Sequence, residues 1–340
     1  MIYSVQYLRG IAALLVVLHH IGIKGAQYNV TLLDGFHIGY FGVDLFFIIS
    51  AFIMCNTTDK KSITFSRFIG ARITRIMPLY WLMSLLALVV FLIKPSLVNS
   101  SGGVTSIWAS FTLLPNGDRY LVNNGWTLSY EFIFYFIFGV AIFLSEKRKI
   151  LITSSIIIML CTLGVMMKFD SSYYTFLTSK MLFEFIMGMG AFIILQKYNL
   201  PKSIATVLLT GGILLLFYQN NFGTIKTPLS RTFFAGIPML MIFIGTVRFE
   251  YILKRQKNKF LKLIEELGNS SYSLYLIHAF VLSPCALIAA KLGLTSYPLI
   301  FCAIPLIASL AAGWLCYKYI ETPINNKLKI HTAKQREKAA

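Results

Sequence analysis

The feature that most constrains this chain is a series of apolar stretches that recurs from its beginning almost to its end. A helix that crosses the hydrocarbon core of a bilayer needs about 20 mostly apolar residues. Several stretches are shorter than this, so tilted or partly interfacial helices are expected. The sequence therefore predicts an all-α, polytopic transmembrane helical bundle of about ten spans. The candidate spans are residues 7–23, 38–56, 77–93, 126–144, 150–167, 181–196, 203–219, 232–247, 271–290 and 298–317.

The composition argues against a soluble or a disordered chain. Hydrophobic residues make up 57% of the 340 positions and charged residues 13%, whereas a soluble domain carries roughly 25% charged residues. A soluble protein of this size must present a polar surface to water, so this much apolar sequence cannot be hidden in one core. Disorder requires low hydrophobicity and is excluded on the same ground.

The chain is strongly basic, and the positions of its basic residues indicate an orientation. Lys and Arg number 31 against 13 Asp and Glu, which gives a net charge of +18. With the amino terminus in the cytoplasm, 23 basic residues fall on the cytoplasmic side and 8 on the other. Cytoplasmic loops carry an excess of Lys and Arg, so both termini are expected inside. The charge then reflects orientation, and no nucleic-acid partner is expected.

The chain is expected to form one transmembrane domain over residues 1–325, followed by a basic cytoplasmic tail over residues 326–340. All five cysteines lie in or beside apolar stretches, and none belongs to a CxxC pair. This pattern is typical of small packing side chains rather than of disulfides or zinc ligands, so no metal is predicted. The cysteines are Cys55, Cys161, Cys285, Cys302 and Cys316.

Ionisable side chains inside apolar stretches are costly in a bilayer and mark candidate functional positions. Arg9 and His20 are eleven residues apart, which places them on one helix face about 16 Å apart along the axis. Asp44 and Glu131 fall near the depth of His20 on two other helices, where a carboxylate would orient the imidazole and raise its basicity. The alternatives are an interfacial arginine and a structural polar knot. Glu184 is equally compatible with a structural and a functional role.

Two arginines precede the third apolar stretch in the run FSRFIGARITRIMPLYW. Arg72 and Arg75 are three residues apart and are therefore neighbours on one helix face. They fall on the predicted cytoplasmic side. Two guanidinium groups on one face suit phosphate groups, which each can bind through paired hydrogen bonds. Anchoring of a basic loop to lipid head groups is the alternative explanation.

The ninth apolar stretch begins with polar residues at helical spacing. Ser271, Tyr275 and His278 follow the i, i+4, i+7 pattern, and Tyr272 lies beside them. Such a stripe lines either a cavity or a hydrogen-bonded seam between helices. The tenth stretch ends in YKYIETP, where the proline is expected to end the helix and Glu321 to pair with an arginine of a loop.

Six short motifs occur in a fixed order over nearly the whole chain, and each alone is a weak signal. They are R-x10-H (Arg9, His20), GVDLFF (42–47), R-x2-R before P-x-Y-W (Arg72, Arg75, Pro78, Tyr80, Trp81), W-x-L-S-x-E (Trp126, Ser129, Glu131), S-Y-S-L-Y-L-x-H (271–278) and E-x-P (Glu321, Pro323). As a set they resemble the acyltransferase type 3 family of integral-membrane acyltransferases. The chain departs from the family pattern at Ala51, where glycine is common, and at Tyr130 and Phe132, which stand where the family often has Val and a second Glu.

The resemblance implies transfer of an acyl group, usually acetyl from acetyl-CoA, to a hydroxyl of a surface or lipid-linked glycan. It implies His20 as the general base or as an acyl carrier, with Asp44 or Glu131 orienting it or contacting the acceptor. Succinyl transfer to exopolysaccharide is the near alternative. The substrate-binding positions are Trp126, Ser129, Tyr272, Tyr275 and His278.

The same resemblance implies that Arg9, Arg72 and Arg75 bind the phosphates of acetyl-CoA from the cytoplasm. The acceptor would then approach from the other face, near residues 94–125, where the stretch IWASFTLLP could re-enter the membrane. The expected location is the bacterial inner membrane, with the lipid bilayer as surroundings. Whether the chain forms a homodimer is left open. A transporter or flippase of lipid-linked sugar and a membrane scaffold are the rival classes.

Overall fold

The computed structural model describes residues 2–60, 62–98, 102–223, 231–255 and 258–328. Its regular elements in these ranges are helices, apart from one isolated bridge between Thr105 and Arg119. Nine helices of the described chain are long and apolar enough to cross a membrane, and Thr232–Arg248 is a shorter apolar helix. The prediction of an all-α transmembrane bundle is therefore confirmed.

Each predicted apolar stretch contains a helix, and shorter helices lie between them. The long helices are α1 (Tyr3–Ala26), α2 (Gly42–Thr58), α3 (Phe65–Ile93), α6 (Gly125–Leu144), α7 (Lys149–Met167), α9 (Phe183–Lys197), α10 (Lys202–Phe222), α12 (Ile237–Arg248), α15 (Ser271–Lys291) and α16 (Pro298–Cys316). The short helices are η1 (His37–Phe41), α4 (Pro95–Val98), α5 (Ile107–Thr112), η2 (Glu146–Arg148), α8 (Ser172–Leu177), η3 (Lys180–Leu182), η4 (Thr232–Gly236), α13 (Glu250–Arg255), α14 (Lys259–Asn269), η5 (Leu294–Ser296) and η6 (Tyr317–Glu321).

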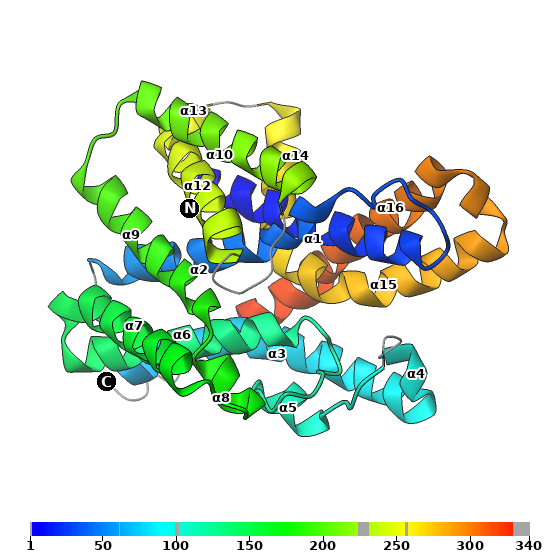
Figure 1. Cartoon of the computed structure of the whole chain (residues 1–340), viewed down its shortest axis with the longest axis horizontal. Coiled ribbons are helices and arrows are strands. Elements are labelled where there is room, and N and C mark those ends of the chain that lie inside the picture. The colour runs from blue at the N-terminus through cyan, green and yellow to red at the C-terminus, as the bar shows by residue number, and fades with distance from the viewer. Residues whose placement is uncertain (1, 61, 99–101, 224–230, 256–257, 329–340) are drawn as a thin grey trace.

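The bundle is built around α2. In its most apolar window 78% of the residues are buried, against 17% for α7 and 22% for α10. Helices with so little of their apolar surface covered belong at the lipid-facing periphery. In Figure 1, α1 lies beside α15 and α16 on one side of the molecule, and α3 lies beside α6 on the other. The space that α2 borders between these groups holds the candidate site.

Helix α3 begins earlier than predicted. It starts at Phe65 rather than at residue 77, because Phe68 and Ile76 are buried and extend the packed face of the helix toward its amino-terminal end. Pro78 lies inside the helix. Arg72 and Arg75, predicted to be neighbours on one helix face, therefore stand on α3 itself.

The last helix is also longer than predicted. A wide π turn at η6 follows α16 without a break, and the helix continues to residue 328. Pro323 therefore does not end the helix, and the prediction that it would is wrong. The N–H that proline lacks would have bonded the carbonyl of Tyr319, which lies inside the irregular turn. Residues 326–328 belong to this helix, while residues 329–340 of the predicted tail lie outside the described residues.

The basic segment between α12 and α15 holds two helices that fasten the start of α1. The carboxylate of Glu250 accepts hydrogen bonds from the backbone N–H groups of Tyr3 (2.9 Å) and Ser4 (2.7 Å), and its charge favours a helix amino terminus. Helix α14 packs closely on α1: a Cβ added at Gly268 would lie 2.0 Å from the carbonyl oxygen of Gln6. These contacts hold the first turns of α1 in place.

The long segment between α3 and α6 folds back onto α3. Its stretch IWASFTLLP forms α5, whose amino terminus is capped by the Ser106 hydroxyl. The indole N–H of Trp81 donates to the carbonyl of Phe111 at 2.9 Å. Entry of this segment into the bilayer stays a prediction.

Candidate functional site

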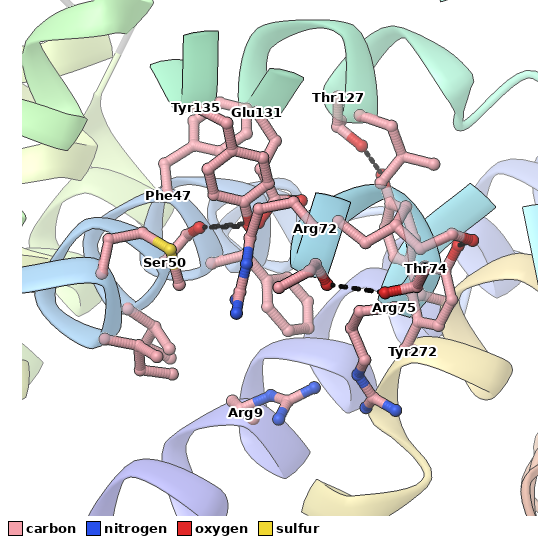
Figure 2. Close-up of a pocket in the computed structure, with 18 of the residues that line it drawn as sticks. Arg9, Phe47, Ser50, Arg72, Thr74, Arg75, Thr127, Glu131, Tyr135 and Tyr272 are labelled. Atoms are coloured by element: carbon pink, nitrogen blue, oxygen red, sulfur yellow. Dashed lines mark hydrogen bonds between the residues drawn. The ribbon is translucent and has the colours of Figure 1, made fainter. Parts of the chain in front are cut away.

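A cavity of about 870 Å³ opens between α1, α2, α3, α6, α15 and the last helix. Figure 2 shows the side chains that point into it. It brings together six of the predicted site residues: Arg9, Arg72, Arg75, Glu131, Tyr272 and Tyr275. The further polar residues of its wall are Ser50, Ser66, Arg67, Thr74, Thr127, Tyr135, Ser271 and Asn325.

Four arginines, which we call the arginine cluster, line this cavity: Arg9, Arg67, Arg72 and Arg75. Figure 2 shows the guanidinium groups of Arg9, Arg72 and Arg75 gathered on one side of it. The Nε of Arg72 is buried and has no hydrogen-bond partner among the described residues. A buried donor without a partner is costly, so this atom is suited to a ligand that brings an acceptor.

Arg75 also holds the cavity wall together. Its Nη1 lies 2.8 Å from Oε1 of Glu321, a carboxylate that is 1% exposed. The second oxygen of Glu321 accepts a hydrogen bond from Ser273 at 2.6 Å. The prediction that Glu321 pairs with an arginine is confirmed, although this arginine lies on α3 and not in a loop. Arg75 therefore both forms an ion pair with Glu321 and lines the cavity.

Glu131 faces the cavity from α6. Its Oε1 accepts hydrogen bonds from the hydroxyl of Ser50, at 2.6 Å, and from that of Tyr135. The two hydroxyls are also 3.0 Å apart, so the three groups form one polar cluster in the cavity wall. These partners lie on α2 and α6, and neither is His20. The expectation that Glu131 orients His20 is therefore not met.

His20 does not line the cavity, and its ring lies against that of a second histidine. The ring centroids of His20 and His278 are 5.0 Å apart, and those of His278 and Tyr275 are 6.0 Å apart. Tyr275 lines the cavity, and its hydroxyl lies 2.8 Å from that of Thr127. Contacts through the rings of His278 and Tyr275 therefore connect His20 to the cavity wall.

Both histidines are held in the same tautomer by their own helices. The Nδ1–H of His20 donates to the carbonyl of Val16 at 2.8 Å, and that of His278 donates to the carbonyl of Leu274 at 3.0 Å. A carbonyl can only accept, so each ring carries its lone pair on Nε2. The Nε2 of His278 is buried without a partner among the described residues. Backbone carbonyls thus replace the carboxylate that the sequence predicted as the orienting group.

Asp44 is engaged elsewhere, in an ion pair that the sequence did not predict. Its two oxygens accept hydrogen bonds from Nε (2.9 Å) and Nη2 (2.6 Å) of Arg231. Asp44 is 0% exposed and Arg231 4% exposed. The carboxyl oxygens of Glu184, also fully buried, have no hydrogen-bond partner within the described ranges. The bidentate pair occupies Asp44, so the expectation that it orients His20 is not met, while its contact with the acceptor stays a prediction.

Replacing Arg231 by methionine is expected to destabilise the protein by about 3–5 kcal/mol, because it leaves Asp44 buried without a counter-charge. Thermal unfolding of the purified protein in detergent measures the loss. The double variant Asp44→Leu with Arg231→Met removes both charges and should recover most of the stability. An Arg231→Met variant that unfolds at the wild-type temperature would contradict the structural importance of the pair.

The remaining predicted positions fall outside the cavity wall. The Ser129 hydroxyl lies 2.8 Å from that of Tyr120 and donates to the carbonyl of Gly125 at 3.2 Å. Burial raises the pKa of Tyr120, so its phenol stays protonated. Trp126 packs edge-on against Tyr130 with ring centroids 6.0 Å apart. Both residues thus contact neighbours within and beside α6, and their contact with the substrate stays a prediction.

Sequence reasoning missed several residues of the site. Arg67 precedes Arg72 in the same basic run, and its position could have been read from that run. Ser50, on α2, gave no sequence signal as a partner of Glu131, because the two residues are 81 positions apart. Arg231 was counted only as a basic residue of an outer loop.

The comparisons with known proteins agree with the motifs. A family model described as an acyltransferase domain matches residues 2–318. The exopolysaccharide production protein ExoZ of Rhizobium meliloti (strain 1021) is 28% identical over 305 residues, which cover 85% of this chain and 90% of that protein. No solved structure shows a significant match. The range matched by the family model contains the arginine cluster, Glu131 and both histidines.

Proposed function

The chain belongs to the acyltransferase type 3 family, and from this premise we propose that it moves an acetyl group from acetyl-CoA to a hydroxyl of an exopolysaccharide or of its lipid-linked precursor. The observation that carries the proposal is a cavity with an arginine cluster on its wall and a histidine pair in contact with its lining residue Tyr275. The first feature suits an anionic donor and the second suits proton removal from a hydroxyl. The acceptor class is inferred from the similarity to ExoZ.

The arginine cluster supports coenzyme A as the carrier of the acyl group. Coenzyme A carries a diphosphate and a ribose phosphate at one end and a thin, uncharged arm at the other. In this proposal the phosphates bind the arginine cluster, Arg75 included, and the arm follows the cavity toward Tyr275. The unpartnered Nε of Arg72 receives a phosphate oxygen.

His20 acts as the general base in this proposal, because its Nε2 lone pair is free of the bond that fixes Nδ1. It takes the proton of the sugar hydroxyl as the oxygen attacks the thioester carbon. The carbon–sulfur bond then breaks, and the proton passes to the departing thiolate of coenzyme A. An acyl-His20 intermediate is the variant mechanism. In this proposal the thioester approaches His20 past Tyr275, which lines the cavity and contacts His278.

Glu131 stays a predicted catalytic residue, but it lies in the cavity wall rather than beside His20. With Ser50 and Tyr135 it forms a polar cluster in the cavity wall, where the acyl-bearing arm passes in this proposal. Its role would be to position the donor rather than to orient His20.

The proposed geometry requires the arginine cluster to face the cytoplasm, where coenzyme A is made. A cysteine introduced at Asn116, an exposed position of the 94–125 segment, should react with a membrane-impermeant thiol reagent added to intact cells. A cysteine at Lys259, an exposed position of α14, should react only after the membrane is opened. The reverse pattern would overturn both the orientation and the donor side. Recovery of the labelled protein in purified inner membranes tests the proposed location.

The proposed function is tested with the purified protein and isotopically labelled acyl donors. The acceptor is the exopolysaccharide of the source cells after mild alkali has removed its ester groups. Acetyl-CoA is expected to label the polysaccharide, and succinyl-CoA is offered in parallel to decide between the two acyl groups. Absence of label from both donors would contradict the proposal and favour a transport or scaffold role.

A further inference from the structure

Tyr40 is held in a fixed position beside α1 by two glycines. It lies in η1, which runs against α1 so closely that a Cβ at Gly39 would lie 2.6 Å from the carbonyl oxygen of Leu15 and 2.8 Å from Cβ of His19. A Cβ at Gly42 would lie 2.4 Å from another α1 carbonyl. Only glycine permits these approaches. The backbone that carries Tyr40 is therefore locked onto the helix that carries His20.

A third contact that fixes the position of η1 comes from α10. The side-chain oxygen of Asn220 accepts hydrogen bonds from the backbone N–H groups of His37 (2.9 Å) and Ile38 (3.2 Å). Its amide nitrogen donates to the carbonyl of Gly35 at 2.7 Å. One side chain thus satisfies three backbone groups of the segment that leads into η1, which limits the motion of that segment.

The ring of Tyr40 rests on a buried cation. The guanidinium carbon of Arg231 lies 3.7 Å from the centroid of the ring, within the range of a strong cation–π contact. Arg231 is itself held by both oxygens of Asp44. Tyr40 nevertheless keeps 38% of its surface exposed. The result is an exposed aromatic ring on a rigid support whose positive charge is already neutralised.

This ring is close to the proposed base. The centroids of Tyr40 and His19 are 5.5 Å apart, and those of His19 and His20 are also 5.5 Å apart. The separation of Tyr40 and His20 therefore cannot exceed the sum of these two distances, which two linked sugar rings can span. Tyr40 lies on η1 and His19 on α1, whereas the cavity-lining Tyr275 lies on α15. His20 is thus linked to Tyr40 through His19 and to Tyr275 through His278.

We propose that Tyr40 is the platform on which a sugar ring of the acceptor stacks while a neighbouring hydroxyl reaches His20. The inference rests on the proposed function and assigns the acceptor subsite within it. The apolar face of a pyranose ring packs on an aromatic ring, and a rigid platform lowers the entropy lost on binding. Because Asp44 neutralises Arg231, this stacking contact favours the shape of a sugar ring rather than an anionic group. Anchoring at the bilayer surface, typical of membrane tyrosines, is the competing role.

The test compares Tyr40→Leu with Tyr40→Phe in the full-length protein, using ester-free exopolysaccharide as the acceptor and acetyl-CoA as the donor. Leucine fills space without an aromatic face, whereas phenylalanine keeps that face. Tyr40→Leu is expected to raise the KM for the polysaccharide at least tenfold and to leave the KM for acetyl-CoA within twofold. Tyr40→Phe should stay within threefold of wild type for both. Tyr297→Ala, which removes an exposed tyrosine next to η5, should leave both values unchanged.

The outcomes separate this inference from the function on which it rests. If wild-type protein labels the polysaccharide and Tyr40→Leu retains the wild-type KM for it, the platform is refuted and the acyltransferase proposal stands. An equal rise in KM for Tyr297→Ala would assign Tyr40 to anchoring and would also refute the platform. If the wild type labels no polysaccharide, the proposed function itself fails. Thermal unfolding of each variant shows that the comparison is made between folded proteins.

Discussion

Replacing His20 by alanine is expected to lower acyl transfer to the polysaccharide by a factor of about 10² to 10⁴, the range that a positioned general base contributes. The imidazole is the proposed proton acceptor, and its tautomer is fixed by the carbonyl of Val16. His20→Gln should be equally inactive, because an amide does not accept the proton. Initial rates with labelled acetyl-CoA and ester-free exopolysaccharide measure the effect.

Two controls decide whether the loss comes from chemistry. His37→Ala removes an exposed imidazole at the start of η1 and should leave the rate within twofold of wild type. His20→Ala should bind coenzyme A with wild-type affinity, because His20 does not line the cavity that holds the arginine cluster. Wild-type transfer by His20→Ala or His20→Gln would end the general-base proposal.

Replacing Arg72 by alanine is expected to weaken coenzyme A binding by roughly 10- to 100-fold. A hydrogen bond to a charged group contributes about 1.5–3 kcal/mol, and each 1.4 kcal/mol changes the dissociation constant about tenfold. Combining Arg72→Ala with Arg75→Ala should weaken it further. Isothermal titration of the purified protein with coenzyme A measures both constants.

The Arg75 change needs its own control, because Arg75 also pairs with the buried carboxylate of Glu321. Arg75→Ala alone leaves that charge without a partner and destabilises the protein. Combining it with Glu321→Gln removes the charge and isolates the loss of phosphate contact. Arg148→Ala, which removes an exposed arginine between α6 and α7, should bind coenzyme A as the wild type does. Unchanged affinity in Arg72→Ala would assign that residue to lipid anchoring.

The fold could be predicted largely from the lengths of the apolar stretches, because a bilayer demands helices of one minimum length. The boundary errors occurred where polar residues continue a helix. Helix α3 extends through Arg67 and Arg72 because its other face is buried, and the last helix passes Pro323 through a π turn. Hydropathy alone does not reveal either extension.

The site was predicted in part, and the errors have a common cause. Position along a helix gives the depth of a side chain but not the neighbour that it faces. Asp44 and His20 were expected at similar depth, yet Asp44 faces Arg231, 187 positions away in the sequence. Arg9, Arg75 and Glu131 do line one cavity, as residues of a common site were expected to.

The central claim is that this chain esterifies an exopolysaccharide through His20. The most direct measurement is mass analysis of the polysaccharide from cells that lack the gene and carry either the wild-type gene or the His20→Ala variant, with equal amounts of protein in the membrane. We expect acetyl esters on the polysaccharide with the wild type and none with the variant. Equal ester content in the two strains would contradict it.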